Sequence, residues 1–267
     1  MGPRTQKYIN LTDLTLAGTG KRMDKSYEAK YHKAEEMQWW FRSRRDIIFR
    51  LIRRENKNSK ILDVGCSSGP LMSLLRRRGF NNISGIDLSD KAIESCKNKG
   101  IKNSFVMDCA KMSFKDNEFD IIIASDILEH IDDEDQALSE LNRVLKPNGK
   151  LVIFVPAFNL LWGMHDEINH HRRRYSKRYL VKVLRKNNFI IKRSSFWNIS
   201  LFFPGSIVRL LQRVIPKKIS KKNDQLYVVN YMTNNLLMRI FKLENKFLQN
   251  FNLPFGLSVF AIAVKKN

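Results

Sequence analysis

Three aspartates lie in or at the end of short apolar runs, with a spacing suited to binding a nucleoside. Asp63 precedes a turn that holds Gly65 and Gly69. Asp87 closes the next run, roughly twenty residues after Gly65, the offset expected of a carboxylate that binds ribose hydroxyls. Asp108 closes a third run and is suited to accept a hydrogen bond from an adenine amino group. One such aspartate is often only a cap or turn residue, but three in this order favour a nucleoside-bearing cofactor.

The elements that position these acids can be read from the apolar pattern. Residues 61–64 suit a central strand, the glycines let backbone approach a ligand, and Pro70 suits the first position of a helix. Residues 118–126 form a further apolar run that ends in polar side chains. Open α/β sheets bind ligands at the carboxyl ends of their strands, so we expect the chemistry near residues 125–130.

These residues resemble the class I S-adenosylmethionine-dependent methyltransferases, over about residues 60–155. The run 63–69 is similar to their first motif, with Ser67 where a middle glycine is often found, and 127–130 is similar to the segment after their fourth strand. A nicotinamide cofactor fits less well because the Gly-x-Gly-x-x-Gly pattern is absent. The resemblance implies that S-adenosylmethionine contacts Asp63, Gly65, Cys66, Gly69, Asp87, Leu88, Asp108, Cys109 and Ser125.

The resemblance also implies the architecture. We expect a Rossmann-like α/β fold whose seven-stranded sheet is mostly parallel with an antiparallel last strand, helices on both faces and a helical insertion. The predicted division is a flexible basic tail (1–22), an N-terminal helical lid (23–56), the cofactor-binding core (57–195), a helical insertion or cap (196–255) and a final core strand (256–267). One helical stretch is expected over 27–54, and later strands over 150–155, 189–193 and 256–264.

Histidines are the candidates for proton transfer. Methyl transfer is a displacement that needs alignment of its partners, plus a base when the acceptor is a hydroxyl. His130 is the first choice because it follows the fourth strand at the expected mouth of the cleft, and an imidazole titrates in a useful range. The alternative is a histidine that only holds the turn.

A second group follows the fifth strand. The run 165–175 resembles a His-Asp-x-x-x-His-x-Arg-Arg-Tyr region that borders the acceptor site in many bacterial members of the family. His165 and His171 are therefore further catalytic candidates. Trp40 and Arg44 come from the N-terminal helix, where an aromatic run either closes a pocket or packs the helix onto the sheet. The predicted substrate-binding residues are Trp40, Arg44, Asp166, Arg173, Arg174 and Tyr175.

A metal site is a further alternative. Asp126, Glu129 and His130 resemble the Glu-x-x-Glu-His segment of the quinone-biosynthesis O-methyltransferases, which is associated with a divalent metal. Two carboxylates and an imidazole could hold magnesium. The same Leu-Glu-His run is common in metal-free relatives, so the prediction is that no metal is required.

Charge and hydropathy bear on the partners. The formal net charge is +22, and no acid occurs between Glu167 and Asp224. Such a stretch either attracts anionic partners or is a solvated basic face. The run 206–215 has a wide apolar face beside two arginines, which suits either an anionic membrane surface or a cap over the active site, whereas 234–251 is interpreted as core.

The remaining composition favours a cytoplasmic protein. The three cysteines show no paired or zinc-like spacing, and no apolar run is long enough to span a bilayer. We expect a cytoplasmic enzyme, with attachment to the inner membrane face as an alternative. The predicted function is methyl transfer, with oxygen favoured, to a small-molecule or a lipid- or glycan-linked acceptor. The competing hypotheses are an RNA or other nucleic-acid methyltransferase or binding protein, and a non-catalytic scaffold on a membrane surface.

Overall fold

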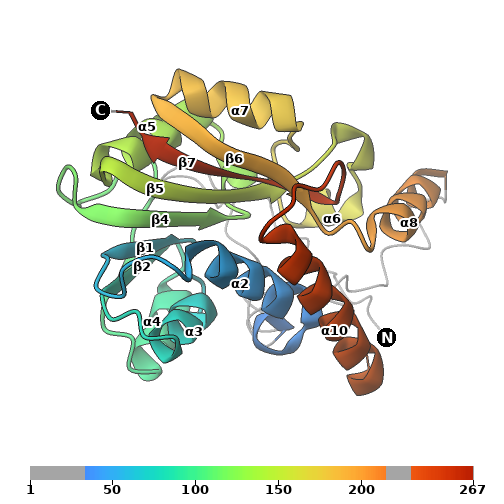
Figure 1. The fold of residues 1–267 in the computed structure, drawn as a ribbon, viewed down its shortest axis with the longest axis horizontal. Helices are drawn as coiled ribbons and strands as arrows, with labels where there is room; N and C mark the ends of the chain where they lie inside the picture. Colours follow the sequence, from blue (N-terminus) through green and yellow to red (C-terminus); the bar gives the residue numbers. More distant parts are fainter. Residues whose placement is uncertain (1–33, 215–229, 267) are drawn as a thin grey trace, which may run out of the picture.

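A seven-stranded sheet organises the computed structural model, which describes residues 34–214 and 230–266. Over these residues the strand order is β3-β2-β1-β4-β5-β7-β6 (Figure 1). Strand β7 is antiparallel to β5 and β6, and the pairings among β3, β2, β1, β4 and β5 are parallel. The expected fold class is thereby confirmed. The bounds are Ile61–Val64 (β1), Ile83–Asp87 (β2), Ser104–Val106 (β3), Phe119–Ser125 (β4), Leu145–Pro156 (β5), Phe189–Trp197 (β6) and Ser258–Lys265 (β7).

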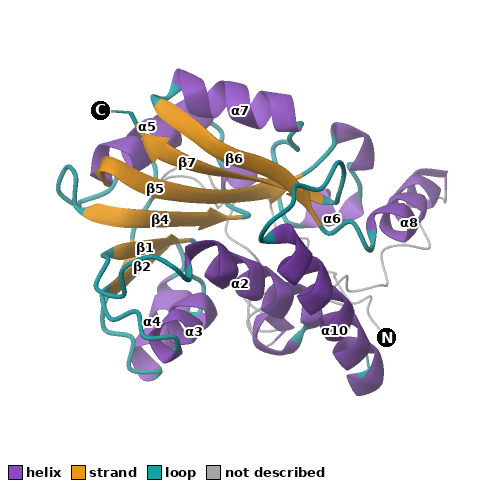
Figure 2. Ribbon diagram, viewed as in Figure 1, coloured by secondary structure: helices purple, strands orange, loops and turns teal. Residues whose placement is uncertain are grey.

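Helices cover both faces of this sheet, as Figure 2 shows. Helices α3 (Pro70–Arg77) and α4 (Asp90–Asn98) pack on β2, whereas α5 (Glu134–Val144) packs on β5 and α7 (Lys177–Lys186) on β6. The central strand β1 is buried along its whole length, which suits its apolar residues Ile61, Leu62 and Val64, and it also buries Asp63. Capping side chains start several helices: the Ser89 hydroxyl accepts from Ala92 N in α4.

The N-terminal helix is broken where one continuous helix was predicted. Residues 34–37 are helical, Gln38 is extended, and α2 (Trp39–Ile52) follows; residues 27–33 lie outside the described part of the chain. The expectation of an unbroken helix is thus wrong at Gln38. A contact from far along the chain stabilises the break, because the backbone N–H of Trp39 donates to Asn234 Oδ1 at 2.7 Å.

Two strands are longer than predicted. Strand β5 takes in the turn 146–149 because Leu145 already pairs with Phe119, before an irregularity in the register. Strand β6 continues to Trp197, since Ser195 and its successors pair with β7. Because this part of β6 contains serines, a search for runs of apolar residues does not predict the strand there.

The helical insertion contributes α8 (Phe202–Val214) and α10 (Tyr231–Leu248). Helix α10 packs against α2, with the rings of Phe241 and Trp39 stacked at 5.0 Å. Asn245 joins three elements: its Nδ2 donates to Ser43 O, and its Oδ1 accepts from Trp197 Nε1. None of the described helices is both long and apolar enough to cross a membrane. The tail 1–22 lies outside the described residues, and the division into lid, core and insertion stays a prediction.

Candidate active site

A pocket of about 180 Å³ opens at the carboxyl ends of β1, β2 and β4. Its walls come from the turn after β1, from the end of β2, from the segment after β4 and from α2. This is the edge of the sheet at which parallel α/β proteins bind ligands. The residues predicted from the sequence that line it are Asp63, Gly65, Cys66, Asp87, Ser125, Asp126, His130 and Arg44.

The turn after β1 depends on Gly65. Its φ of +71° is in the left-handed region, and a Cβ there would lie 2.0 Å from Ile127 Cδ1. Any side chain at this position would therefore clash with the segment that follows β4. Ser67, which replaces the middle glycine of the motif, also has a positive φ of 49°, and its backbone N–H donates to Asp87 Oδ2 at 2.9 Å.

Asp87 is fixed at the end of β2. Its second carboxylate oxygen accepts from Ser89 N, also at 2.9 Å. Two backbone N–H groups thus orient the carboxylate beside the pocket, as the proposed ribose contact requires. Asp63 lines the same pocket, and burial and then the nearby Glu35 raise its pKa well above the usual range. A neutral Asp63 can donate a hydrogen bond as well as accept one.

Four of the predicted cofactor residues do not line this pocket. Asp108 accepts from Ala110 N at 2.8 Å, which matches the alternative of a turn residue. Cys109 is buried, and burial raises its pKa to about 12. Leu88 is exposed, and Gly69 caps α3 with a φ of +78°. A cofactor contact for these four positions stays a prediction.

Ser125 and Asp126 belong to the far wall. The Ser125 hydroxyl donates to Asp126 Oδ2 at 3.2 Å. Asp126 Oδ1 lies 3.3 Å from Nη2 of Arg44, a buried guanidinium that also donates to Ser258 Oγ at 2.9 Å. Arg44 lies over the rings of Trp197 and Phe154, at 4.3 and 4.4 Å from the centroids. The Arg44 side chain thus brings a positive charge from α2 to the wall of the pocket.

His130 is the one histidine among the described residues that lines the pocket. It ends the short helix η1 (Leu128–His130), and its ring meets that of His171 edge to face at 4.7 Å. Burial and the neighbouring His171 lower the pKa of His130 to about 4. The imidazole is therefore neutral at physiological pH and able to accept a proton.

Asp166 holds His171 behind His130. Its carboxylate is fully buried and lies 2.8 Å from His171 Nδ1, 2.8 Å from Arg174 Nε and 2.9 Å from the donor Gly163 N. Burial opposes its ionisation, but His171 and Arg174 outweigh burial, so the pKa of Asp166 falls below its usual range. An ionised carboxylate can only accept, so Asp166 accepts from His171 Nδ1 and fixes the orientation of that ring. His165 lies further out, exposed on α6 (Met164–Ile168).

Arg173, Arg174 and Tyr175 use their polar atoms inside the protein. Arg174 donates to Ala157 O as well as to Asp166, and the fully buried Tyr175 donates from its hydroxyl to Glu134 Oε2 at 2.7 Å. Arg173 donates to the carbonyl oxygens of Ile131 and Asp132. These contacts hold the segment 163–175 against the segment after β4. Trp40 packs on Trp197 outside the pocket, as the packing alternative proposed.

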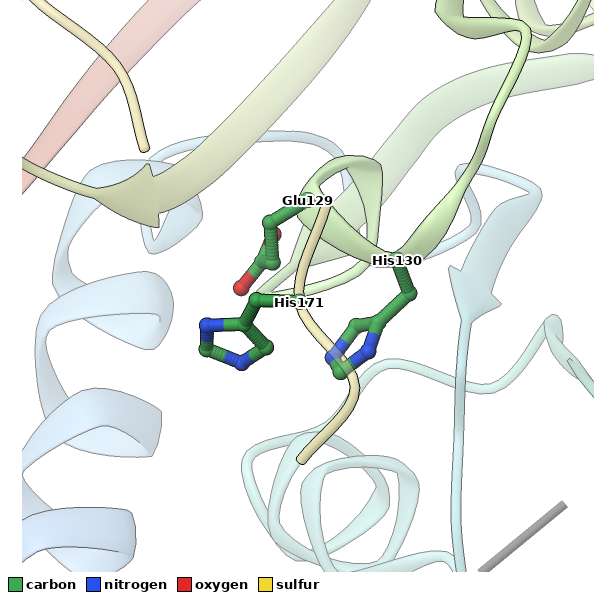
Figure 3. Close-up of side chains that lie close together, drawn as sticks. All are labelled: Glu129, His130 and His171. Carbon is green, nitrogen blue, oxygen red and sulfur yellow. The ribbon is translucent and has the colours of Figure 1, made fainter. Parts of the chain in front are cut away.

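Glu129 is a buried acid that the sequence grouped with Asp126 and His130. It is fully buried, and neither carboxylate oxygen has a hydrogen-bond partner among the described residues. Burial and then Asp126 raise its pKa well above the usual range. Figure 3 shows its carboxyl group turned toward His171, and ligand atoms of Glu129, His130 and His171 lie within 4.8 Å of one another. Asp126, which the sequence placed with Glu129 and His130, lies outside this group and pairs with Arg44.

Comparison with known proteins agrees with the fold. Residues 62–153 match the family described as a methyltransferase domain. The ubiquinone biosynthesis O-methyltransferase of Pelagibacter ubique is 29% identical over 180 residues, which are 59% of this chain and 72% of that protein. The chain is therefore similar to methyltransferases, as the sequence resemblance predicted.

Solved structures of low sequence identity share the fold. Haemonchus contortus phosphoethanolamine N-methyltransferase 2, in complex with S-adenosyl-L-methionine, aligns with a TM-score of 0.54 at 20% identity, over 85% of this chain and 53% of that one. A chain from the complex between the Haloferax volcanii Trm112 methyltransferase activator and a methyltransferase aligns with a TM-score of 0.60 at 16% identity, over 91% and 95% of the two chains. Both alignments show the Rossmann-like fold that the sequence predicted.

Proposed function

We propose that this protein transfers a methyl group from S-adenosylmethionine to a hydroxyl oxygen of a small-molecule or lipid-linked acceptor. The observation that carries the proposal is a neutral imidazole, His130, on the wall of the pocket that also holds the fixed carboxylate of Asp87. The cofactor supplies an electrophilic methyl carbon on a sulfonium. The protein must align the acceptor with this methyl carbon and remove the proton of the acceptor hydroxyl.

We assign removal of the acceptor's hydroxyl proton to His130. As the acceptor oxygen forms its bond to the methyl carbon, the bond between that carbon and sulfur breaks and the hydroxyl proton passes to the free ring nitrogen of His130. The products are the methyl ether or ester, S-adenosylhomocysteine and a protonated His130. His171 and the ionised Asp166 behind it are positioning residues, because their contact fixes one face of the His130 ring.

A divalent ion is the alternative route to an activated oxygen. Glu129, His130 and His171 are the residues that would hold it, and the unpartnered oxygens of Glu129 suit a ligand. A carboxylate with two imidazoles favours zinc or a similar transition metal over magnesium, which prefers oxygen donors. The ion would act as a Lewis acid on the acceptor oxygen. Glu129 and His171 are not among the residues that line the pocket, so we assign the chemistry to His130 without a metal.

Calorimetric titration with S-adenosylmethionine and S-adenosylhomocysteine is the first test. We expect micromolar binding that weakens in Asp87→Asn. Transfer of a labelled methyl group to fractions of a lipid extract and of a soluble metabolite extract follows, with the product bond identified by mass spectrometry. A methylated hydroxyl supports the proposal, whereas methylation only at nitrogen or carbon contradicts the role of His130 as a base.

A further inference from the structure

Helix α10 has one face packed in the protein and another that is unusual for a solvent-exposed surface. Its buried face includes Met238, Phe241 and Leu248. Its other face carries large apolar side chains at helical spacing, which we call the α10 stripe. The stripe consists of Met232 (81% exposed), Leu236 (58%), Ile240 (37%), Leu243 (70%) and Phe247 (51%).

The charges beside the α10 stripe have one sign. Arg239, Lys242 and Lys246 are exposed on the same helix. The one acid of residues 231–248 is Glu244, which is buried and accepts from the backbone N–H groups of Asn198 and Ser200. The exposed side of α10 is therefore apolar and cationic, with no negative charge from its own residues. This composition is typical of a helix that lies in the interface of an anionic bilayer.

A second helix also lacks acids and exposes apolar side chains. Helix α8 has no acid in residues 202–214, and it exposes Phe203, Ile207 and Leu211. In Figure 1 both α8 and α10 project from the end of the sheet at which β4 finishes, the end where the pocket opens. Helix α10 also packs on α2, whose Phe41 and Arg44 line the pocket. The apolar faces thus belong to the elements that border the site.

We propose that the α10 stripe docks the protein on an anionic lipid bilayer. The alternative occupant, a second copy of this chain, would bring Arg239, Lys242 and Lys246 against the same three cations. Like charges that meet across an interface oppose association, whereas anionic headgroups neutralise these cations while the apolar side chains enter the acyl boundary. The surface does not depend on the proposed methyl acceptor, because docking can be measured without catalysis.

Flotation of the full-length protein with vesicles tests the proposal. One set contains phosphatidylcholine alone, and the other contains phosphatidylcholine mixed with phosphatidylglycerol. We expect binding to the mixed vesicles and at least about tenfold weaker binding of Leu243→Glu, because a charge replaces an inserted apolar group and repels the headgroups. Removing the cations together, in Arg239→Gln/Lys242→Gln/Lys246→Gln, is expected to weaken binding about fivefold per charge.

The matched control is Ile190→Glu, the same kind of change at an exposed apolar residue at the start of β6. It is expected to leave flotation unchanged, and S-adenosylmethionine binding by both variants reports that they are folded. Loss of vesicle binding with retained cofactor binding therefore separates this inference from the proposed function. The inference would be overturned if the wild type fails to float, or if Leu243→Glu floats equally well. It would also be overturned if competitor RNA displaces the vesicles while Leu243→Glu has no effect, or if sedimentation shows a dimer that Leu243→Glu dissociates.

Discussion

The two ends of the pocket are built in different ways. At the cofactor end, one turn and one strand end supply most contacts, and the key bonds join Ser67 and Ser89 to Asp87, at most twenty residues apart. At the proposed acceptor end, His130 of η1 lines the pocket and the segment 163–175 packs behind it, where Arg209 of α8 contacts Asp166 across 43 residues. A cofactor that is the same throughout a family can be held by local backbone geometry. An acceptor that differs between members of the family is contacted by side chains from separate elements. Changes at the acceptor end are therefore expected to alter turnover, and changes at the cofactor end to alter affinity.

The largest expected effect is at the acceptor end. His130→Ala is expected to lower kcat by about a thousandfold, since general acid–base groups contribute on the order of 10²–10⁴. Calorimetric affinity for S-adenosylmethionine should be retained. His171→Asn serves as the comparison, because a positioning residue should lower kcat less while KM for the acceptor changes little. Equal turnover of wild type and His130→Ala would remove His130 from the chemistry.

Lowering the pH should destabilise the fold because His130 becomes protonated. The pKa of His130 is lowered to about 4 in the folded protein, against roughly 6.5 when unfolded, so the unfolded state binds the proton first as pH falls. Stability contributed by the neutral ring is complete above about pH 6.5 and is lost toward about pH 4, by about 3 kcal/mol. Urea unfolding of wild type and His130→Gln across this window measures the difference. Parallel pH profiles for the two proteins would contradict the assignment.

The cofactor end should respond through affinity. Asp87→Asn keeps an acceptor for the backbone N–H groups but removes the charge, so S-adenosylmethionine should bind about ten- to a hundredfold more weakly. The control is Asp90→Asn, in the first turn of α4, which should bind normally. If both variants bind as tightly as wild type, the ribose assignment fails.

The smallest expected effect is that of chelation. We expect EDTA to change turnover by less than about twofold, since the proposal gives the proton to His130 rather than to a metal-bound oxygen. Turnover is compared before and after dialysis against EDTA, then with added zinc, manganese or magnesium. Loss of activity that one of these ions restores would assign the chemistry to Glu129, His130 and His171 as ligands.

Local sequence patterns predicted the sheet and several residues that line the pocket, whereas four of the predicted cofactor residues lie outside its lining. Gly65 and Asp87 follow from strand-end spacing, and the sheet follows from apolar runs. The group of Glu129 with His171 could not be found this way, because 42 positions separate them and only packing brings them together. Tyr175 and Arg174 matched a motif near the acceptor site, yet their polar atoms bind Glu134 and Asp166. A motif gives residue types, and the partners of those residues depend on distant segments.

The exposed stripe of α10 was missed for a related reason. The sequence showed apolar residues on several sides of the helix, and the interpretation as core holds for Phe241 and Leu248. Leu243 and Phe247 are equally apolar but face outward. Composition cannot divide such a helix into faces, since the division is set by where α2 packs. The structure supplied that partner.

The position of β7 has a consequence for synthesis of the chain on the ribosome. Strand β7 is the last of the described elements, yet it lies between β5 and β6, so both strands present unpaired edges until residues 258–265 emerge. Helix α2 also waits for α10, across 195 residues at the Trp39–Asn234 contact. At roughly 5–20 residues per second this wait lasts on the order of ten to forty seconds. Nascent chains halted before β7 should therefore recruit chaperones, and release of the finished chain should end that dependence.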